Sequence, residues 1–222
     1  FLCARHKHER MDWAMRHSHW GENQWRRIVW SDESRFRLHA PDGRARVWRR
    51  KGQRFQPQHI VQTRVAGGGS VHIWGAIRKG GRSQLVILNR SVTGVVYRQV
   101  LQENLLPLIP ILGDPQYQWL FQDDNALPHR SKLVADFKRA NGIRTLKWPA
   151  KSPDMNPIEH VWDEMRRRIF RAERVPANIE QLTTAIRQQW EEIPQEFFDN
   201  LIASMNRRVR ALLEANGGHT SY

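Results

Sequence analysis

The hydrophobic pattern in the first half of the chain predicts extended strands. Residues 25–38 (WRRIVWSDESRFRL) place β-forming side chains on both sides of a polar interruption, which indicates one long or bent strand. Residues 70–77 (SVHIWGAI) and 83–89 (SQLVILN) predict two more strands, and the Gly-Gly pair between them is typical of a hairpin. We therefore expect the first three strands to form an antiparallel group.

Helical periodicity alternates with short strands further along the chain. Helices are predicted over residues 93–106 and 131–141, the second with a glycine stop at Gly142. Short strands are predicted over residues 117–122 and 143–148. Alternating strands and helices after an antiparallel group predict an α/β fold, a mixed sheet with helices on its faces.

The last third of the chain is predicted to be helical. Asn156 precedes Pro157, which is typical of a side-chain cap in front of a proline at the first helical position. Two more amphipathic helices are predicted over residues 176–193 and 195–215. These patterns divide the chain into three parts, namely a helical segment (1–24), a main domain (25–175) and C-terminal helices packed on that domain (176–222).

Composition adds a strong positive charge to this picture. The 222 residues include 36 Lys and Arg against 22 Asp and Glu, a formal net charge of +14. Arg dominates the basic set, and its planar guanidinium binds phosphate bidentately and stacks on bases. This balance favours a polyphosphate partner. The alternative on composition alone is a basic but unspecialised globular domain.

Other features exclude whole classes of protein. With Cys3 as its single cysteine, the chain forms no internal disulfide and no cysteine-built metal cluster. The longest strongly apolar run, residues 105–112, contains two prolines and is far shorter than the roughly 20 residues of a membrane helix, so no membrane partner is expected. The first residues lack the pattern of a secretory signal, and the absent initiator Met suggests a piece of a longer chain. We expect an intracellular protein, nuclear if its source is a eukaryote.

A basic insertion separates the first two predicted strands. Residues 35–64 carry nine basic side chains and a single acid, Asp42. Connections this long in a compact domain usually serve a function, and Trp48 and Phe55 add stacking surface. A solvated basic hairpin is the alternative. The candidate DNA-binding residues of the insertion, whose bounds we place at about 39–68, are Arg44, Arg46, Arg49, Arg50, Lys51 and Arg54.

Three acids stand where this order of elements brings strand ends and a helix start together. Asp32 and Asp124 each follow an apolar strand run, and Glu159 lies in the first turn of its helix. Ligand sites of open sheets gather at strand ends. Converging carboxylates repel one another unless a cation neutralises them, and a pair of Mg²⁺ ions can promote in-line phosphoryl displacement. Spacing alone is weak support for such a site, so the flanking residues decide.

Those flanking residues resemble the mariner superfamily of DNA transposases. The segments that carry the resemblance, in chain order, are 30–34 (WSDES), 67–70 (GGGS), 73–75 (IWG), 121–125 (FQDDN), 147–149 (KWP), 152–159 (SPDMNPIE) and 217–222 (GGHTSY). Thirty-four residues separate Asp124 from Glu159, which is similar to the Asp-Asp-Glu subgroup of that superfamily. Several separate motifs in the right order make coincidence a poor explanation.

The resemblance implies a ribonuclease-H-like fold with a mixed sheet flanked by helices. It implies that the basic insertion is a clamp that reaches a second protomer, hence a homodimer. Asp32, Asp124 and Glu159 would hold two Mg²⁺ ions, for which Mn²⁺ can substitute. The implied activity is metal-dependent cleavage of double-stranded DNA at transposon ends and joining of the freed 3′ hydroxyl to target DNA.

Supporting roles are assigned to Asn125, His129 and Asn156. His129 either orients a carboxylate or a DNA end near the metals or only caps the following helix, and Asn125 has the same two readings. Asn156 is expected to be a helix cap first and a site residue second. Asp123 departs from the family pattern, which more often has an uncharged residue there, and strand alternation predicts that it points away from Asp124.

Two functions of other classes remain open. The helix-turn-helix modules that precede this region in the family are absent, so a DNA-binding remnant without cleavage is one alternative. A ribonuclease-H-like nuclease without strand transfer is the other. Intact carboxylates favour catalysis, and the clamp-like insertion favours a transposase. The run Arg166, Arg167 and Arg168 either contacts phosphate or lines a solvated helix face, whereas Trp162 and Trp190 are expected in the core.

Overall fold

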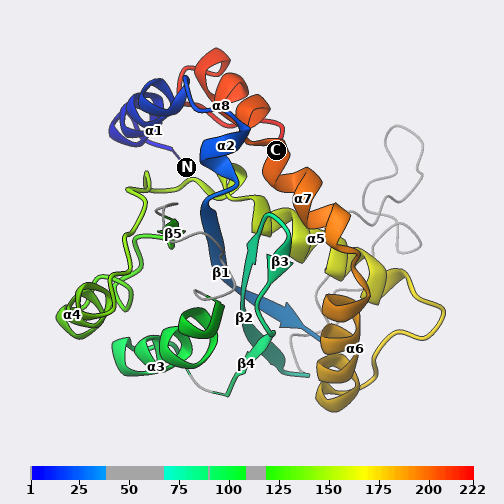
Figure 1. Cartoon of the computed structure of the whole chain (residues 1–222). Helices are drawn as coiled ribbons and strands as arrows, with labels where there is room; N and C mark the ends of the chain where they lie inside the picture. The colour runs from blue at the N-terminus through cyan, green and yellow to red at the C-terminus, as the bar shows by residue number, and fades with distance from the viewer. Residues whose placement is uncertain (1, 39–67, 90, 109–118) are drawn as a thin grey trace, which may run out of the picture.

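A mixed β-sheet forms the centre of the protein, with helices on both of its faces (Figure 1). The computed structural model describes residues 2–38, 68–89, 91–108 and 119–222. The five strands are ordered β3-β2-β1-β5, with β4 also paired to β2. Their bounds are Ile28–Arg37 (β1), Ser70–Arg78 (β2), Gly81–Arg82 (β3), Val86–Leu88 (β4) and Leu120–Gln122 (β5).

β1 is the strand on which the two pairing senses meet. It pairs antiparallel with β2 in a register that sets Asp32 opposite Gly75. It pairs parallel with β5, where Val29 faces Phe121. The predicted mixed sheet and antiparallel group are therefore confirmed.

Eight α-helices surround the sheet in the described residues. Their bounds are Ala4–His17 (α1), Glu22–Trp25 (α2), Gly94–Val100 (α3), Lys132–Ala140 (α4), Pro157–Arg171 (α5), Ile179–Glu192 (α6), Gln195–Ala203 (α7) and Met205–Glu214 (α8). A π turn (Leu101–Leu105) and a 3-10 turn (Leu106–Leu108) extend α3, and a 3-10 turn (Pro153–Met155) precedes α5. In this part of the chain no helix is long and apolar enough to cross a membrane.

Side-chain alternation divides the interior into two apolar cores. Ile28 and Trp30 of β1 pack with α5 to α8 on one face, whereas Val29 packs with α3 and α4 on the other. Gly75 brings the first core close to the sheet, since a Cβ atom there would lie 2.9 Å from the Trp162 ring and 3.0 Å from the Trp190 ring. The helix that carries Glu159 is thus packed directly against the strand that carries Asp32.

The strand predicted over residues 83–89 is wrong as a single element. Ser83 still bonds to Ala76, donating its backbone N–H and accepting the N–H of Ala76 on its hydroxyl at 2.9 Å. Pairing resumes only at Val86, so two residues stand opposite Gly75, which is a β-bulge. The Ser83 hydroxyl replaces a main-chain acceptor there. The predicted strand is therefore shortened to β4, and β3 lies just before it, in the predicted turn.

Two further predictions are corrected. Residues 143–148 form no strand, because β5 is short and offers them a single parallel bridge at Thr145. The helix predicted over residues 195–215 is divided at Ser204, whose hydroxyl donates to Leu201 O at 2.6 Å and competes with the helical hydrogen bonds. The part of the predicted strand 117–122 before residue 119, and residues 39–67 of the basic insertion, lie outside the described residues.

Candidate active site

Asp32 lies at the middle of β1, with its carboxylate on the side of α5. Trp162 donates its indole N–H to Asp32 Oδ2 at 3.1 Å. Burial raises the pKa of Asp32 well above its usual range, and the charges of Glu159, Glu33 and Asp124 raise it further. Trp162 is buried as predicted, yet its polar edge also contacts this carboxylate.

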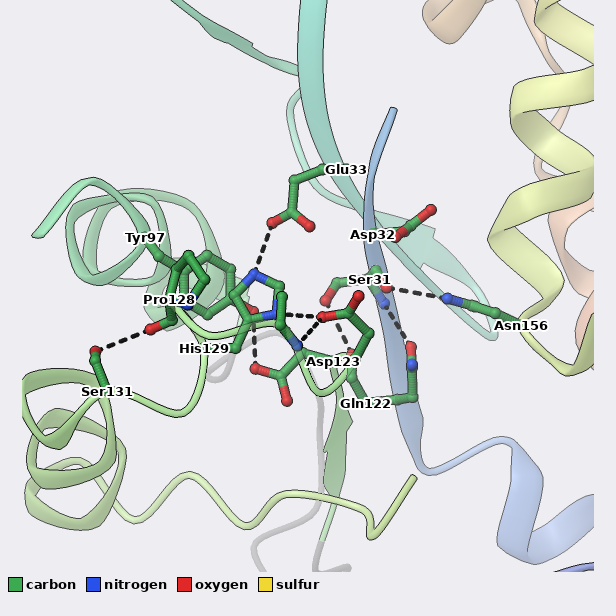
Figure 2. Close-up of polar contacts among 12 residues, drawn as sticks. Ser31, Asp32, Glu33, Tyr97, Gln122, Asp123, Pro128, His129, Ser131 and Asn156 are labelled. Atoms are coloured by element: carbon green, nitrogen blue, oxygen red, sulfur yellow. Dashed lines mark hydrogen bonds and ion pairs between the residues drawn. The ribbon is translucent and has the colours of Figure 1, made fainter. Parts of the chain in front are cut away.

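Glu159 stands in the first turn of α5, three residues after the N-cap residue Asn156. Asn156 accepts the N–H of Ile158 on its side-chain oxygen at 3.3 Å, which begins the helix. The same side chain donates through Nδ2 to Ser31 O at 3.1 Å (Figure 2). Asn156 therefore caps α5 and also fixes its start against the residue before Asp32. Burial raises the pKa of Glu159, the charge of Arg166 opposes that rise, and the charge of Asp163 adds to it.

Asp124 is held by His129 from the loop that follows β5. His129 Nδ1 lies 2.7 Å from Asp124 Oδ1. Its Nε2 lies 3.2 Å from Glu33 Oε1, a contact drawn in Figure 2. Burial alone would lower the pKa of His129, but its bonds to Asp124 and Glu33 raise it to about 10. Burial alone would raise the pKa of Asp124, yet His129 and the Ala126 N–H hold it below its usual value. The N-cap of the following helix is Ser131, so His129 takes the orienting position rather than the capping one.

A second layer of polar groups supports His129 from behind. The Tyr97 ring stacks on the imidazole with centroids 3.8 Å apart. Tyr97 donates its hydroxyl to Asp123 Oδ2 at 2.9 Å, and Lys138 forms a buried ion pair with the same carboxylate. Asp123 thus points away from Asp124, as alternation predicts. No pattern in the sequence indicated a role for Glu33, Tyr97 or Lys138, and the out-of-pattern acid at Asp123 was the one local signal of this layer.

The remaining candidates have other contacts. Asn125 is exposed and donates to Trp148 O at 2.8 Å, so it fastens its loop to the segment 143–148. Arg166 donates to Ser34 Oγ at 2.6 Å beside the site. Arg167 and Arg168 instead pair with Glu164 on the same helix. The candidate DNA-binding residues of the insertion (Arg44, Arg46, Arg49, Arg50, Lys51, Arg54) lie outside the described residues.

A buried cluster of guanidinium groups fixes the turn in front of α5. Arg10 of α1 is fully buried and binds Asp154 bidentately at 2.7 and 2.6 Å. Thr220 of the C-terminal segment donates to the same carboxylate at 2.9 Å. Arg208 of α8 donates to Asp154 O at 2.7 Å and reaches His160 Nδ1 at 3.2 Å. No pattern in the sequence indicated this cluster, because its members come from opposite ends of the chain.

The three carboxylates have the donor chemistry of a divalent-cation site. The described residues form no group of three or more His, Cys, Asp and Glu side chains that could hold a metal ion as they stand. Asp32 nevertheless carries charge repulsion from both Glu159 and Asp124 with one N–H donor identified against it. A hard cation that takes oxygen ligands relieves such repulsion, so the residues fit Mg²⁺ or Mn²⁺.

Two cavities border the carboxylates, one at Asp124 and one at Glu159. One of about 660 Å³ is lined by Asp124 and His129 among others. Another of about 550 Å³ is lined by Glu159, His160 and Asp163 among others. Each cavity therefore shares one carboxylate with the site.

Comparisons with known proteins agree on one family. A family profile described as "DDE superfamily endonuclease" matches residues 27–183. Over its whole length the chain is 35% identical to the transposable element Tcb1 transposase of Caenorhabditis briggsae and 34% identical to the Tc1 transposase of Caenorhabditis elegans, and it covers 80% of each.

Solved structures show the same fold. The catalytic domain of Mos1 transposase, in a structure with raltegravir and Mn, superposes with a TM-score of 0.75 at 18% identity, covering 100% of this chain and 99% of that one. The Mos1 mariner paired end complex with Mn gives a TM-score of 0.82 at 20% identity, with 100% of this chain and 65% of that chain covered. The expected ribonuclease-H-like architecture, a mixed sheet flanked by helices, is therefore confirmed.

Proposed function

The chain belongs to the DDE endonuclease superfamily as the catalytic region of a cut-and-paste DNA transposase, and we propose that Asp32, Asp124 and Glu159 are its catalytic carboxylates. The observation that carries this assignment is a set of polar contacts that brings the three acids together from β1, α5 and the loop after β5. Trp162, one turn after Glu159 on α5, donates to Asp32 at 3.1 Å. His129 lies between Asp124, at 2.7 Å, and Glu33, the residue after Asp32, at 3.2 Å. The enzyme is a polynucleotidyl transferase.

The proposed cofactor is Mg²⁺, with Mn²⁺ as a substitute, bound as two ions by the three carboxylates. Mos1 catalytic-domain structures with Mg and with Mn support divalent metal use in this fold. These three carboxylates would hold the ions, which would supply activation of the attacking oxygen and neutralisation of charge on the phosphate. The number of two rests on the family resemblance.

The protein's own part in the reaction is to hold each carboxylate in position. Trp162 orients Asp32 through its indole N–H, and His129 holds Asp124 ionised and fixed on one oxygen. Asn156 aligns the start of α5 with β1, which sets Glu159 beside Asp32. Preorganised ligands of this kind reduce the rearrangement needed when metal and DNA bind.

Double-stranded DNA, including transposon ends and target, is the proposed substrate, and a homodimer the proposed working form. Mos1 neighbours that are paired end complexes support both. The basic insertion at about 39–68 is the proposed clamp, with Arg44, Arg46, Arg49, Arg50, Lys51 and Arg54 as its DNA contacts. A DNA substrate favours a nuclear location in a eukaryotic host. The packing of α6 to α8 in one core with α5 supports their assignment to the catalytic domain.

The experiment is a cleavage assay on a labelled duplex with Mg²⁺ or Mn²⁺, comparing the intact chain with Glu159→Gln. The substitution keeps size and helical position but removes one charged ligand, so cleavage should fall by orders of magnitude while DNA binding persists. Glu180→Gln, at an exposed acid in the first turn of α6, is the matched control and should keep its activity. Equal cleavage by the intact chain and Glu159→Gln would reject the assignment.

Pre-cut DNA ends separate the remaining alternatives. A transposase joins the supplied 3′ hydroxyl to a second duplex, whereas a ribonuclease-H-like nuclease cleaves without joining. No cleavage and no joining by the intact chain, with DNA binding retained, would favour the non-catalytic remnant.

A further inference from the structure

A basic cavity lies beside Asp124, and the proposed function makes no use of it. Its volume is about 660 Å³, and it lies between the loop after β5, α4 and the segment 142–148. Exposed basic side chains line it from three sides, namely Arg130, Arg139, Arg144 and Lys147. Because Asp124 and His129 form part of the same wall, the cavity opens directly onto the candidate active site.

The acids in this wall are already compensated by cations of the protein. Asp123 is buried and paired with Lys138, and Asp124 lies against His129. Arg139 pairs with Asp136 at 3.1 Å on the outer surface of α4. The cavity therefore presents a net positive charge to whatever enters it.

Local structure explains why the basic side chains face this cavity. Gly142, with φ of +64°, ends α4 and turns the chain beside β5. Two main-chain hydrogen bonds hold the following segment beside β5. Phe121 donates its N–H to Arg144 O, and its C=O accepts the N–H of Leu146. Ile143 and Leu146 are buried by that arrangement, which leaves Arg144 and Lys147 exposed at the rim.

The cavity next to Glu159, of about 550 Å³, has a mixed lining. Glu159 and Asp163 lie in its wall together with Lys151, and Asp163 is paired with Arg166 at 3.1 Å. A DNA strand carries one negative charge per phosphate, so its backbone is attracted more strongly to the cavity at Asp124, where basic side chains predominate.

We propose that the basic cavity binds backbone phosphates of the DNA strand immediately next to the scissile phosphate. This inference rests on the proposed function, which sets the scissile phosphate at Asp124. Arg130, Arg144 and Lys147 then contact the following phosphates as the strand leaves the metal site. Such contacts fix the register of the strand without reading its sequence.

The test measures binding of a pre-cut duplex, without divalent metal, at several salt concentrations. The double variant Arg144→Gln/Lys147→Gln should flatten the slope of log affinity against log salt by about 2, since each lost phosphate contact removes about 1. The matched control is Arg167→Gln/Arg168→Gln, which removes the same charge from α5, outside the lining of this cavity. The control slope should stay near that of the intact chain, and thermal unfolding checks that both variants fold.

Neutral methylphosphonate linkages then locate the contact on the DNA. Replacing the phosphates next to the scissile position should weaken binding by the intact chain and by the control, but not further weaken the cavity variant. Equal slopes for cavity and control variants, or weakening that is the same in all three proteins, would overturn the proposal. If Glu159→Gln abolishes cleavage while the cavity variant matches its control, the proposed function stands and this inference fails. If Glu159→Gln cleaves normally, the proposed function fails, and the linkage data still judge the cavity.

Discussion

The two flanks of the carboxylate site are held by different forces. On the Asp124 flank, ionised groups alternate from Glu33 through His129 to Asp124, with the Asp123–Lys138 pair behind them. On the Glu159 flank, a helix cap and the buried Arg10–Asp154 pair fix the backbone in front of the acid. One carboxylate is therefore oriented by neighbouring charge, and the other by the position of its helix.

This difference indicates whether substitutions on each flank should affect activity or stability. A charge-held carboxylate depends on single side chains, so substitutions there should reduce activity more than stability. A backbone-held carboxylate depends on the fold around it, so substitutions there should reduce stability first. The following predictions test that division.

Arg10→Ala should produce the largest change, a loss of about 3–5 kcal/mol in the free energy of unfolding. The substitution leaves the Asp154 carboxylate, whose side chain is 12% exposed, without its bidentate partner. Removing one partner of a buried ion pair typically costs about 3–5 kcal/mol. Urea unfolding measures it. Arg16→Ala, at an exposed pair on the same helix, is the control and should change stability by less than about 1 kcal/mol. A small effect of Arg10→Ala would break the comparison on the Glu159 flank.

His129→Gln should lower metal-dependent cleavage or metal affinity by about 10–100-fold while the fold survives. Residues that orient a metal ligand typically have effects of this size. Cleavage rates measured over a range of Mn²⁺ concentrations separate the effect on the rate from the effect on metal affinity. Thermal unfolding checks that the fold survives. His72→Gln on β2 is the matched histidine control. If His129→Gln lost stability and kept its cleavage rate, Asp124 would not be held by charge.

Trp162→Phe should reduce the cleavage rate by about tenfold. A hydrogen bond to a charged group contributes about 1.5–3 kcal/mol, and only the part of it that differs between ground state and transition state changes the rate. Trp190→Phe removes a similar buried indole whose N–H binds Ser83 O instead of a carboxylate. Both variants should lose similar stability. Matching cleavage rates for the two would show that the indole N–H of Trp162 does not orient Asp32.

Acid stability should show the smallest effect. Burial would raise the pKa of Asp154, but the Arg10 guanidinium outweighs it and holds that pKa below the usual value. The unfolded carboxyl then binds a proton at higher pH than the folded one, so this contribution is present above about pH 4 and is lost as the pH falls further. Melting temperatures between pH 6 and pH 2.5 should fall less for Asp154→Asn than for the intact chain. Parallel curves would contradict it.

Periodicity and local chemistry were enough to predict most elements of the fold. Runs of β-forming side chains identified β1 and β2, and the Asn156-Pro157 pair gave the start of α5. The bulge after Ser83 was not predicted, because it depends on a hydrogen bond between the Ser83 hydroxyl and the Ala76 N–H of the neighbouring strand β2. The sequence of a short strand such as β5 also does not indicate how few residues of a neighbouring segment can pair with it.

The candidate carboxylates were found through their flanking motifs, whereas their supports were not. His129 and Glu33 are far apart in sequence, and nothing near either residue indicates the other. The same is true of Arg10 and Asp154. The apolar stripe of α5 correctly predicted that Trp162 is buried, but a periodic pattern carries no information on where an indole N–H points.

The parallel pairing of β1 with β5 has a consequence for how the enzyme is made. The β2–β3 hairpin joins neighbouring residues and can form early, but β1 gains β5 only after a long intervening stretch has been synthesised. Asp32 therefore leaves the ribosome well before Asp124, and Glu159 follows later still. We expect nascent and truncated chains to bind DNA through their positive charge while lacking an assembled cleavage centre. The order of synthesis thus delays nuclease activity until the domain is complete.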